Sequence, residues 1–148
     1  MVYDYYGRAF PSTYSVFDGF RYSNAFLAAF DSSGVKAWDN GMEMRDILTT
    51  FLNHKMNYVF NGREMTLFYN ANGKLAVKTI KGPETLDNTE YVSIASKRQT
   101  DQVSYEYLGT MEHWYDNYYL ASGYQTIRNN YLTENKRNVF YLNKMAFE

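Results

Sequence analysis

Turns built around glycine separate short runs of residues along much of this chain, and in several runs apolar and polar side chains alternate. Three such runs follow one another at Lys55–Phe60, Arg63–Tyr69 and Lys74–Lys81. The residues between them are Asn61-Gly62 and Asn70-Ala71-Asn72-Gly73. A period of two is typical of a half-buried strand, and Asn-Gly is typical of a two-residue hairpin. We therefore predict a three-stranded antiparallel meander here.

A second hairpin is predicted from Asn24–Phe30 and Val35–Trp38, which flank Asp31-Ser32-Ser33-Gly34. Asp at the first position and Gly at the last suit a type I turn in which Gly takes a positive φ. We predict further strands at Tyr91–Ser96, Val103–Glu112, Tyr118–Ile127 and Asn138–Phe147.

Two of these later strands carry more specific expectations. In the strand 103–112, we expect Tyr105, Tyr107 and Met111 to share one face with Gly109. The last strand contains Val139-Phe140-Tyr141-Leu142, which is apolar on both faces. Such a run is typical of a central strand, so we expect the last strand to lie inside a sheet and to be needed for folding.

The segment 42–54 fits two structures. Met44, Ile47 and Phe51 lie at helix-like spacing, together with Leu48 and Leu52. The β-branched residues Ile47, Thr49 and Thr50 favour a strand instead. The sequence leaves one short helix and a strand as alternatives.

Composition agrees with a β-rich fold. The chain has 148 residues, of which 45% are hydrophobic and 21% charged, as in a globular domain of ordinary size. Aromatic residues make up 19%, with 16 Tyr, 10 Phe and 2 Trp, and such rings favour strands. We predict one mainly β domain over residues 1–148, with antiparallel meander and hairpin sheets arranged as an open sandwich or as propeller-like blades.

The absence of cysteine excludes disulfides, thiolate metal sites and a cysteine nucleophile. It is compatible with the cytosol and equally with a periplasmic or extracellular location. The first residues have neither a basic nor an apolar signal region, so we expect either a cytoplasmic protein or a chain cut from a longer exported precursor. The longest apolar run, Ala25–Phe30, is far shorter than the roughly 20 residues of a membrane span.

The sequence carries no enzyme signature. His54 and His113 are its only histidines, and His113 has the acidic neighbours Glu112 and Asp116, which makes a histidine–carboxylate pair conceivable. No nucleophile elbow, zinc-binding helix or phosphate-binding loop is present. We therefore expect no metal and no cofactor. A net charge of −1 gives no attraction to nucleic acid.

The candidate binding site is a patch of aromatic and polar residues near position 116. It comprises Trp114, Tyr115, Asp116, Tyr118 and Tyr119. If exposed, these rings and the carboxylate would suit a sugar or a partner protein. If buried, they fill a core.

Two hairpins of the chain also match when they are aligned turn on turn. Residues 28–38 align with residues 67–77, and Gly34 and Gly73 are 39 positions apart. This offset is near the period of a propeller blade, although two hairpin turns of this length share Asp or Asn and Gly in any case.

The segment Phe30-Asp31-Ser32-Ser33-Gly34, with Trp38-Asp39-Asn40, resembles the blade hairpin of bacterial β-propeller and related secreted β-repeat proteins. The tail, with His113–Tyr119, Gly123-Tyr124-Gln125 and Val139–Lys144, is similar to the C-terminal β-rich domains of uncharacterised exported proteins of Gram-negative bacteria. The resemblance implies an extracytoplasmic β-domain. It implies no activity and no functional residue.

From these features we expect a non-catalytic structural or interaction domain of an extracytoplasmic bacterial protein. A protein partner or self-association fits the open sheets and the many rings. One alternative is a carbohydrate-binding module that uses the aromatic patch. The other is a glycoside hydrolase that pairs two of the 16 acidic residues from distant strands.

Overall fold

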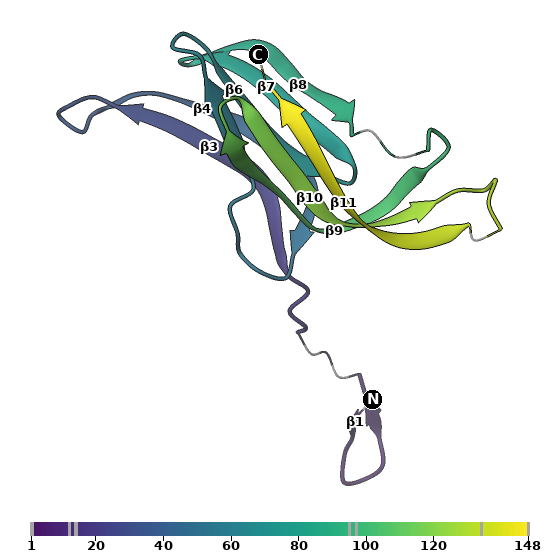
Figure 1. Cartoon of the computed structure of the whole chain (residues 1–148). Coiled ribbons are helices and arrows are strands. Elements are labelled where there is room, and N and C mark those ends of the chain that lie inside the picture. The colour runs from purple at the N-terminus through teal and green to yellow at the C-terminus, as the bar shows by residue number, and fades with distance from the viewer. Residues whose placement is uncertain are drawn as a thin grey trace.

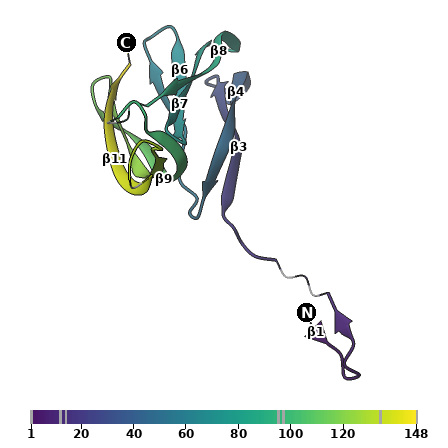
Figure 2. The same cartoon turned by 90° about the vertical axis from the view of Figure 1, so that its right-hand side faces the viewer.

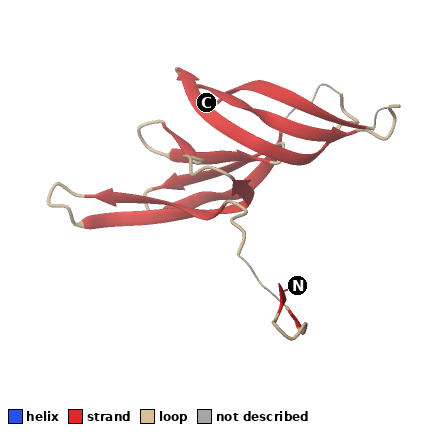
Figure 3. Cartoon of the chain, turned by 90° about the horizontal axis from the view of Figure 1, so that it is seen from below, coloured by secondary structure: helices blue, strands red, loops and turns tan. Residues whose placement is uncertain are grey.

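The computed structural model describes residues 2–11, 13, 15–94, 96, 98–133 and 135–147. Within these residues every regular element is a strand and every strand pair is antiparallel, which confirms the predicted all-β fold (Figures 1 and 3). The strands are β1 (Val2–Tyr3), β2 (Ala9–Phe10), β3 (Phe20–Phe30), β4 (Lys36–Thr49), β5 (Asn57–Phe60), β6 (Met65–Ala71), β7 (Lys74–Lys81), β8 (Glu84–Ser93), β9 (Gln102–Tyr115), β10 (Tyr118–Arg128) and β11 (Lys136–Ala146).

The main body has three layers. The middle layer is a four-stranded sheet in the order β5-β6-β7-β8. The hairpin β3-β4 covers one face of this sheet, and the three-stranded sheet β11-β10-β9 covers the other (Figure 2). The short hairpin β1-β2 stands apart from the body (Figures 1 and 2).

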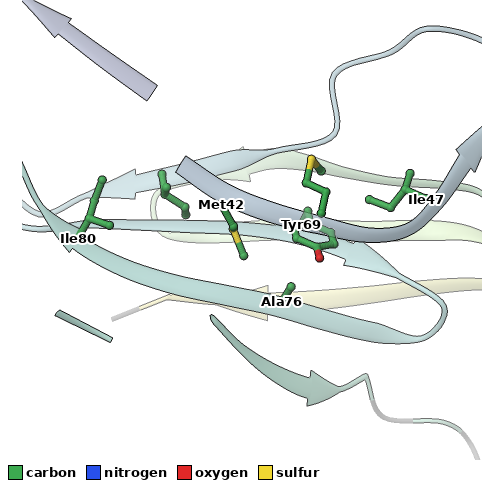
Figure 4. Close-up of a cluster of buried hydrophobic side chains, with 7 residues drawn as sticks. Met42, Ile47, Tyr69, Ala76 and Ile80 are labelled. Carbon is green, nitrogen blue, oxygen red and sulfur yellow. The ribbon is translucent and has the colours of Figure 1, made fainter. Parts of the chain in front are cut away.

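The first core lies between β4 and the middle sheet. Met42, Met44 and Ile47 of β4 pack against Leu67 and Tyr69 of β6, and these side chains are at most 6% exposed (Figure 4). Ala76 and Ile80 of β7 complete this cluster. Burial of this apolar surface is what fixes the β3-β4 hairpin to the sheet.

The second core lies on the opposite face of the middle sheet. Phe68 of β6 is fully buried and stacks on Phe147 with 4.1 Å between ring centroids. Tyr119 of β10 meets the same Phe68 ring edge to face at 4.8 Å. Met111 and Ala121 are buried beside these rings. Leu67 and Phe68 are neighbours in sequence, so β6 is buried on both faces.

The segment 42–54 forms a strand and no helix over most of its length. β4 extends to Thr49, and its pairing with β3 changes register between the partners Tyr22 and Asn24. The extra residues at this bulge separate the inward side chains Met44 and Ile47 by three positions. The helix-like spacing in the sequence therefore reflects a bulge. Phe51 and Leu52 follow the strand and are more than 70% exposed.

The predicted meander 55–81 is confirmed, and β8 adds a fourth strand to it. β8 begins at Glu84, before the predicted strand 91–96, and residue 95 of that prediction lies outside the described residues. The prediction of a two-residue turn at Asn61-Gly62 is wrong, because the register closes at Phe60 and Met65 around a four-residue loop.

The two hairpins that align in the sequence close differently. The β3-β4 connection runs from Asp31 to Val35, with Gly34 at φ +79° and its N–H donated to the Asp31 carbonyl, as predicted for that turn. The β6-β7 connection is the two-residue turn Asn72-Gly73, in which both residues have positive φ. The two hairpins also belong to different layers of an open sandwich.

The prediction that the last strand is central is wrong. Among the described strands β11 pairs only with β10, and it forms an edge of the three-stranded sheet. Phe140 and Leu142 are about 60% exposed on one face, whereas Tyr141 and Met145 pack on the second core from the other face. An edge strand with apolar residues on both faces resembles a central strand in sequence. The pattern of side chains does not show whether other strands pair with both of its edges.

Candidate functional site

The three-stranded sheet carries a row of large apolar side chains on the face that points away from the middle layer. Tyr107 of β9, Tyr124 of β10 and Phe140 of β11 lie side by side in register. The ring centroids of Tyr107 and Tyr124 are 5.6 Å apart, and those of Tyr124 and Phe140 are 5.3 Å apart. Leu142 extends the row along β11 and is 61% exposed. We call these four residues the outer strip.

A bulge in β9 creates part of the outer strip. The pairing with β10 shifts register between Ser122 and Tyr124, so β9 contains one extra residue there. Tyr107 therefore points outward, whereas Gly109 and Met111 point inward and are buried. The prediction that Tyr105, Tyr107 and Met111 share one face with Gly109 is wrong for this reason.

Three of the predicted site residues come together at the end of the β9-β10 hairpin, near the outer strip. Trp114 and Tyr115 are 52% and 40% exposed, and Tyr118 is half-buried. The Lys144 ammonium of β11 lies over all three rings, at 5.5, 5.0 and 3.6 Å from the centroids of Trp114, Tyr115 and Tyr118. Lys144 also donates a hydrogen bond of 2.7 Å to the Tyr115 hydroxyl.

The Lys144 ammonium determines what this cluster can bind. A cation over a ring face is attracted by the electron density of that face, so the face of Tyr118 is occupied by the chain itself. A sugar that stacks on aromatic rings needs the same faces free. The sequence alone gave no sign of Lys144, because strand pairing brings this residue next to rings that are about 30 positions away.

The other two predicted residues have different roles. Tyr119 is 6% exposed in the second core, and its hydroxyl donates to the Tyr58 carbonyl at 3.0 Å. Asp116 forms the hairpin turn with φ +48°. His113 Nε2 bonds to the main-chain carbonyl oxygen of Asp116 at 2.8 Å and not to its carboxylate. The conceivable histidine–carboxylate pair is therefore not formed with Asp116.

A polar cluster that the sequence did not reveal lies between the sheets. The Glu106 carboxylate accepts hydrogen bonds from the Gly73 amide at 2.6 Å, the Tyr141 hydroxyl at 2.9 Å and the Gln125 amide at 3.1 Å. Asn70 Nδ2 donates to the Tyr141 hydroxyl at 2.9 Å. These partners come from three strands and one turn, and they take the place of water around a charged group.

Lys55 adds the opposite charge to this polar cluster. Its ammonium is buried and donates to the Gly109 carbonyl. Burial lowers the pKa of Lys55, and the nearby Glu106 carboxylate opposes this shift. The adjoining cavity is only about 20 Å³, too small to admit a substrate. The geometry therefore indicates a structural role, in which the cluster joins the middle sheet to the three-stranded sheet.

A larger cleft of about 800 Å³ lies on the inner side of β11. Its apolar lining includes Ile94, Val103, Ile127, Leu132 and Val139. Of the described lining residues only Asp101 carries a carboxylate.

That carboxylate is already engaged. It accepts hydrogen bonds from Asn129 at 2.8 Å and from Arg137 at 2.5 Å, which together hold the pKa of Asp101 below its usual range. A two-carboxylate hydrolase needs a second acid, and the described lining of this cleft supplies none. Across the described part of the chain, no three His, Asp or Glu side chains gather as a metal site. That part of the chain also holds no helix long and apolar enough to cross a membrane.

Comparison with known proteins gives no relative from which a role can be inferred. No protein-family model, no curated protein and no solved structure matches this chain.

Proposed function

We propose that this chain is a non-catalytic interaction domain that binds a partner protein through the outer strip. The observation that carries the proposal is the row Tyr107, Tyr124, Phe140 and Leu142, four large apolar side chains exposed side by side on one face of the three-stranded sheet. Single exposed apolar residues are ordinary, but a contiguous group is typical of a binding surface.

The ring geometry favours a protein partner over a sugar. Tyr124 meets Phe140 at an interplanar angle of 63° and Tyr107 at 31°, so the rings pack on one another and leave no flat platform. Aromatic side chains, Tyr among them, are enriched among the residues that dominate protein interfaces. Burial of each of these side chains would contribute on the order of 1 kcal/mol or more.

The test is capture of partner proteins from an extract of the source cells, with quantitative mass spectrometry. We expect the double variant Tyr107→Ala/Tyr124→Ala to lose at least ten-fold in recovery of a specifically captured protein. Phe26→Ala is the matched control, because Phe26 is 77% exposed on β3 in the opposite layer. Equal recovery with the wild type and the double variant would contradict the proposal.

Carbohydrate binding is the second candidate, favoured by one observation. Trp114 keeps half of its surface exposed at the end of the hairpin, beside Tyr115. Affinity electrophoresis in polysaccharide gels tests it, since retardation that disappears in Trp114→Ala would support a sugar site. Retardation that persists in Trp114→Ala, or none with the wild type, would leave protein binding as the function.

The setting that we propose is periplasmic or extracellular. It is supported by the resemblance of the Phe30–Gly34 turn and of the tail to exported bacterial proteins, and it is compatible with the absence of cysteine. Fractionation of source cells, with an antibody against the chain, checks this location. Recovery with a cytoplasmic marker enzyme would contradict it.

A further inference from the structure

The outer edge of β11 has main-chain groups available for another strand. Main-chain hydrogen bonds join Asn129 to Asn135 at one end of the β10-β11 pair and Phe147 to Asn117 at the other end. Since bonded positions alternate along an antiparallel pair, the odd-numbered residues of β11 bond to β10. The N–H and C=O groups of Phe140 and Leu142 therefore point away from β10, and they have no partner within the described part of the chain.

The cleft of about 800 Å³ opens along this same edge. Five consecutive residues of β11, Val139–Asn143, line it, together with apolar side chains of the inner face. A strand added to β11 would place alternate side chains into the cleft and the others beside Phe140 and Leu142 on the outer face. The free edge, the cleft and the end of the outer strip thus all lie where a fourth strand of this sheet would lie.

The same chain carries a segment that suits this position. Residues 2–11, which we call the arm, stand clear of the body in both views (Figures 1 and 2). Their side-chain hydrogen bonds stay within the arm, between Asp4 and Tyr6 or Arg8. Tyr3, Tyr5 and Tyr6 are 65%, 98% and 79% exposed. Tyrosine suits a cleft with an apolar floor and a polar rim.

We propose that the arm of a second copy of this chain gives up its two-residue β1-β2 pairing and adds as an extended strand to the free edge of β11, and that two copies exchange arms reciprocally. The inference goes beyond the proposed function, because it concerns the strand edge and the cleft of this chain and not an outside partner. When two copies exchange arms about a two-fold axis, both arms pair with a strand and both β11 edges are covered.

The area available is sufficient for a stable dimer. Each buried aromatic side chain covers about 150 Å² or more. Three rings from each of two arms, with matching area on the clefts and on the outer face of β11, would bury on the order of 1,800 Å². Stable interfaces bury about 1,200–2,000 Å².

Sedimentation velocity of the full chain tests the proposal. We expect a dimer at micromolar concentration. Leu142→Pro should shift it to monomer, because proline removes the outward N–H of residue 142 and leaves the bonds from Tyr141 and Asn143 to β10 intact. Leu142→Ala, which keeps that N–H, is the matched control and should remain dimeric. Tyr3→Ser/Tyr5→Ser should also be monomeric, and it cannot disturb a body that the arm does not contact.

Disulfide trapping identifies the interface, because the natural chain has no cysteine. A chain with Tyr5→Cys mixed with a differently tagged chain with Leu132→Cys should form a mixed-chain disulfide under mild oxidation. Replacing the second partner with Val35→Cys, on the distant β3-β4 turn, should reduce the yield at least ten-fold.

Three outcomes would overturn the inference. The first is a wild type that is monomeric at 100 µM. The second is equal trapping at positions 132 and 35. The third is a dimer that persists in Leu142→Pro but is lost in Tyr107→Ala/Tyr124→Ala, which would place the interface on the outer strip. Loss of partner capture with an intact dimer in that double variant would support both proposals separately.

Discussion

At the level of single residues, buried polar groups hold the two sheets in one orientation. Glu106 reaches the Gly73 amide in the middle sheet and the Tyr141 and Gln125 side chains in the three-stranded sheet. A buried carboxylate must keep its donors, because a buried charge without partners is costly. The polar cluster thus positions the outer strip and the cleft relative to the core.

Tyr141 should make the fold sensitive to alkali. Burial, and next the Glu106 charge, raise the pKa of its hydroxyl above the ordinary value of about 10. The unfolded chain therefore releases this proton near pH 10 while the folded chain retains it, so its contribution to stability is complete below pH 10 and is lost as the pH rises above 10. We expect the free energy of unfolding to fall by up to about 1.4 kcal/mol per pH unit from this group.

Urea unfolding between pH 8 and pH 11 checks this dependence. Tyr141→Phe should lose about 1–2 kcal/mol at pH 8, because a buried hydrogen bond is lost, and should fall less steeply than the wild type above pH 10. The lowered pKa of Lys55 acts in the opposite direction, but it is common to both chains. Tyr131→Phe, at an 85% exposed position, is the control and should follow the wild type. Parallel curves for Tyr141→Phe and the wild type would contradict the prediction.

At the level of elements, β6 is the strand on which both cores depend. Leu67 points to the β3-β4 hairpin and Phe68 to the three-stranded sheet, and both are fully buried. In a sheet with one solvated face, one of two neighbouring residues would be exposed. The alternation that predicted this strand correctly therefore said nothing about which face was covered.

Alanine substitutions at two neighbouring positions of β6 should each destabilise the fold, because β6 is buried on both faces. We expect Leu67→Ala and Phe68→Ala each to lower the free energy of unfolding by about 3–4 kcal/mol, because each leaves a cavity in a different core. Leu86→Ala on the edge strand β8, where the side chain is 40% exposed, should cost less than half as much. Chemical denaturation measures all three. A small effect at either β6 position would show that the corresponding layer is not packed on the sheet.

At the level of the whole molecule, the middle sheet packs against both outer layers. The chain has two tryptophans, and they lie in different outer layers, with Trp38 in β4 and Trp114 in β9. A two-stranded hairpin is marginally stable alone, and both outer layers bury their apolar inner faces against the middle sheet, so each depends on that sheet. The expectation of a single domain can therefore be tested as cooperativity.

Two single-tryptophan variants provide the test. Trp114→Phe leaves fluorescence from the β3-β4 layer, and Trp38→Phe leaves fluorescence from the three-stranded sheet. We expect each fluorescence transition in urea to coincide with the circular dichroism transition of the same variant, as two-state unfolding requires. The wild type is the control for the effect of each substitution. A fluorescence midpoint that departs from the circular dichroism midpoint would mean that one layer unfolds separately.

The sequence by itself determined the local structure, because strand periodicity and turn residues act over a few positions. Asp31 with Gly34 and the alternation in 65–81 predicted hairpins that the structure confirms. The exposed position of Trp114 and Tyr115 was one of two alternatives that the sequence left open. The same reasoning failed at bulges, since two extra residues in β4 and one extra residue in β9 change which side chains share a face.

Only the tertiary structure decided which faces and edges are covered. The apolar run 139–142 gave no indication that β11 is an edge strand, and nothing near position 106 indicated a cluster formed from four strands. Lys144 over the Trp114 cluster is equally a product of strand pairing. The physical reason is common to all three. Burial and long-range pairing depend on how sheets stack in space, and a local pattern of side chains carries no record of that stacking.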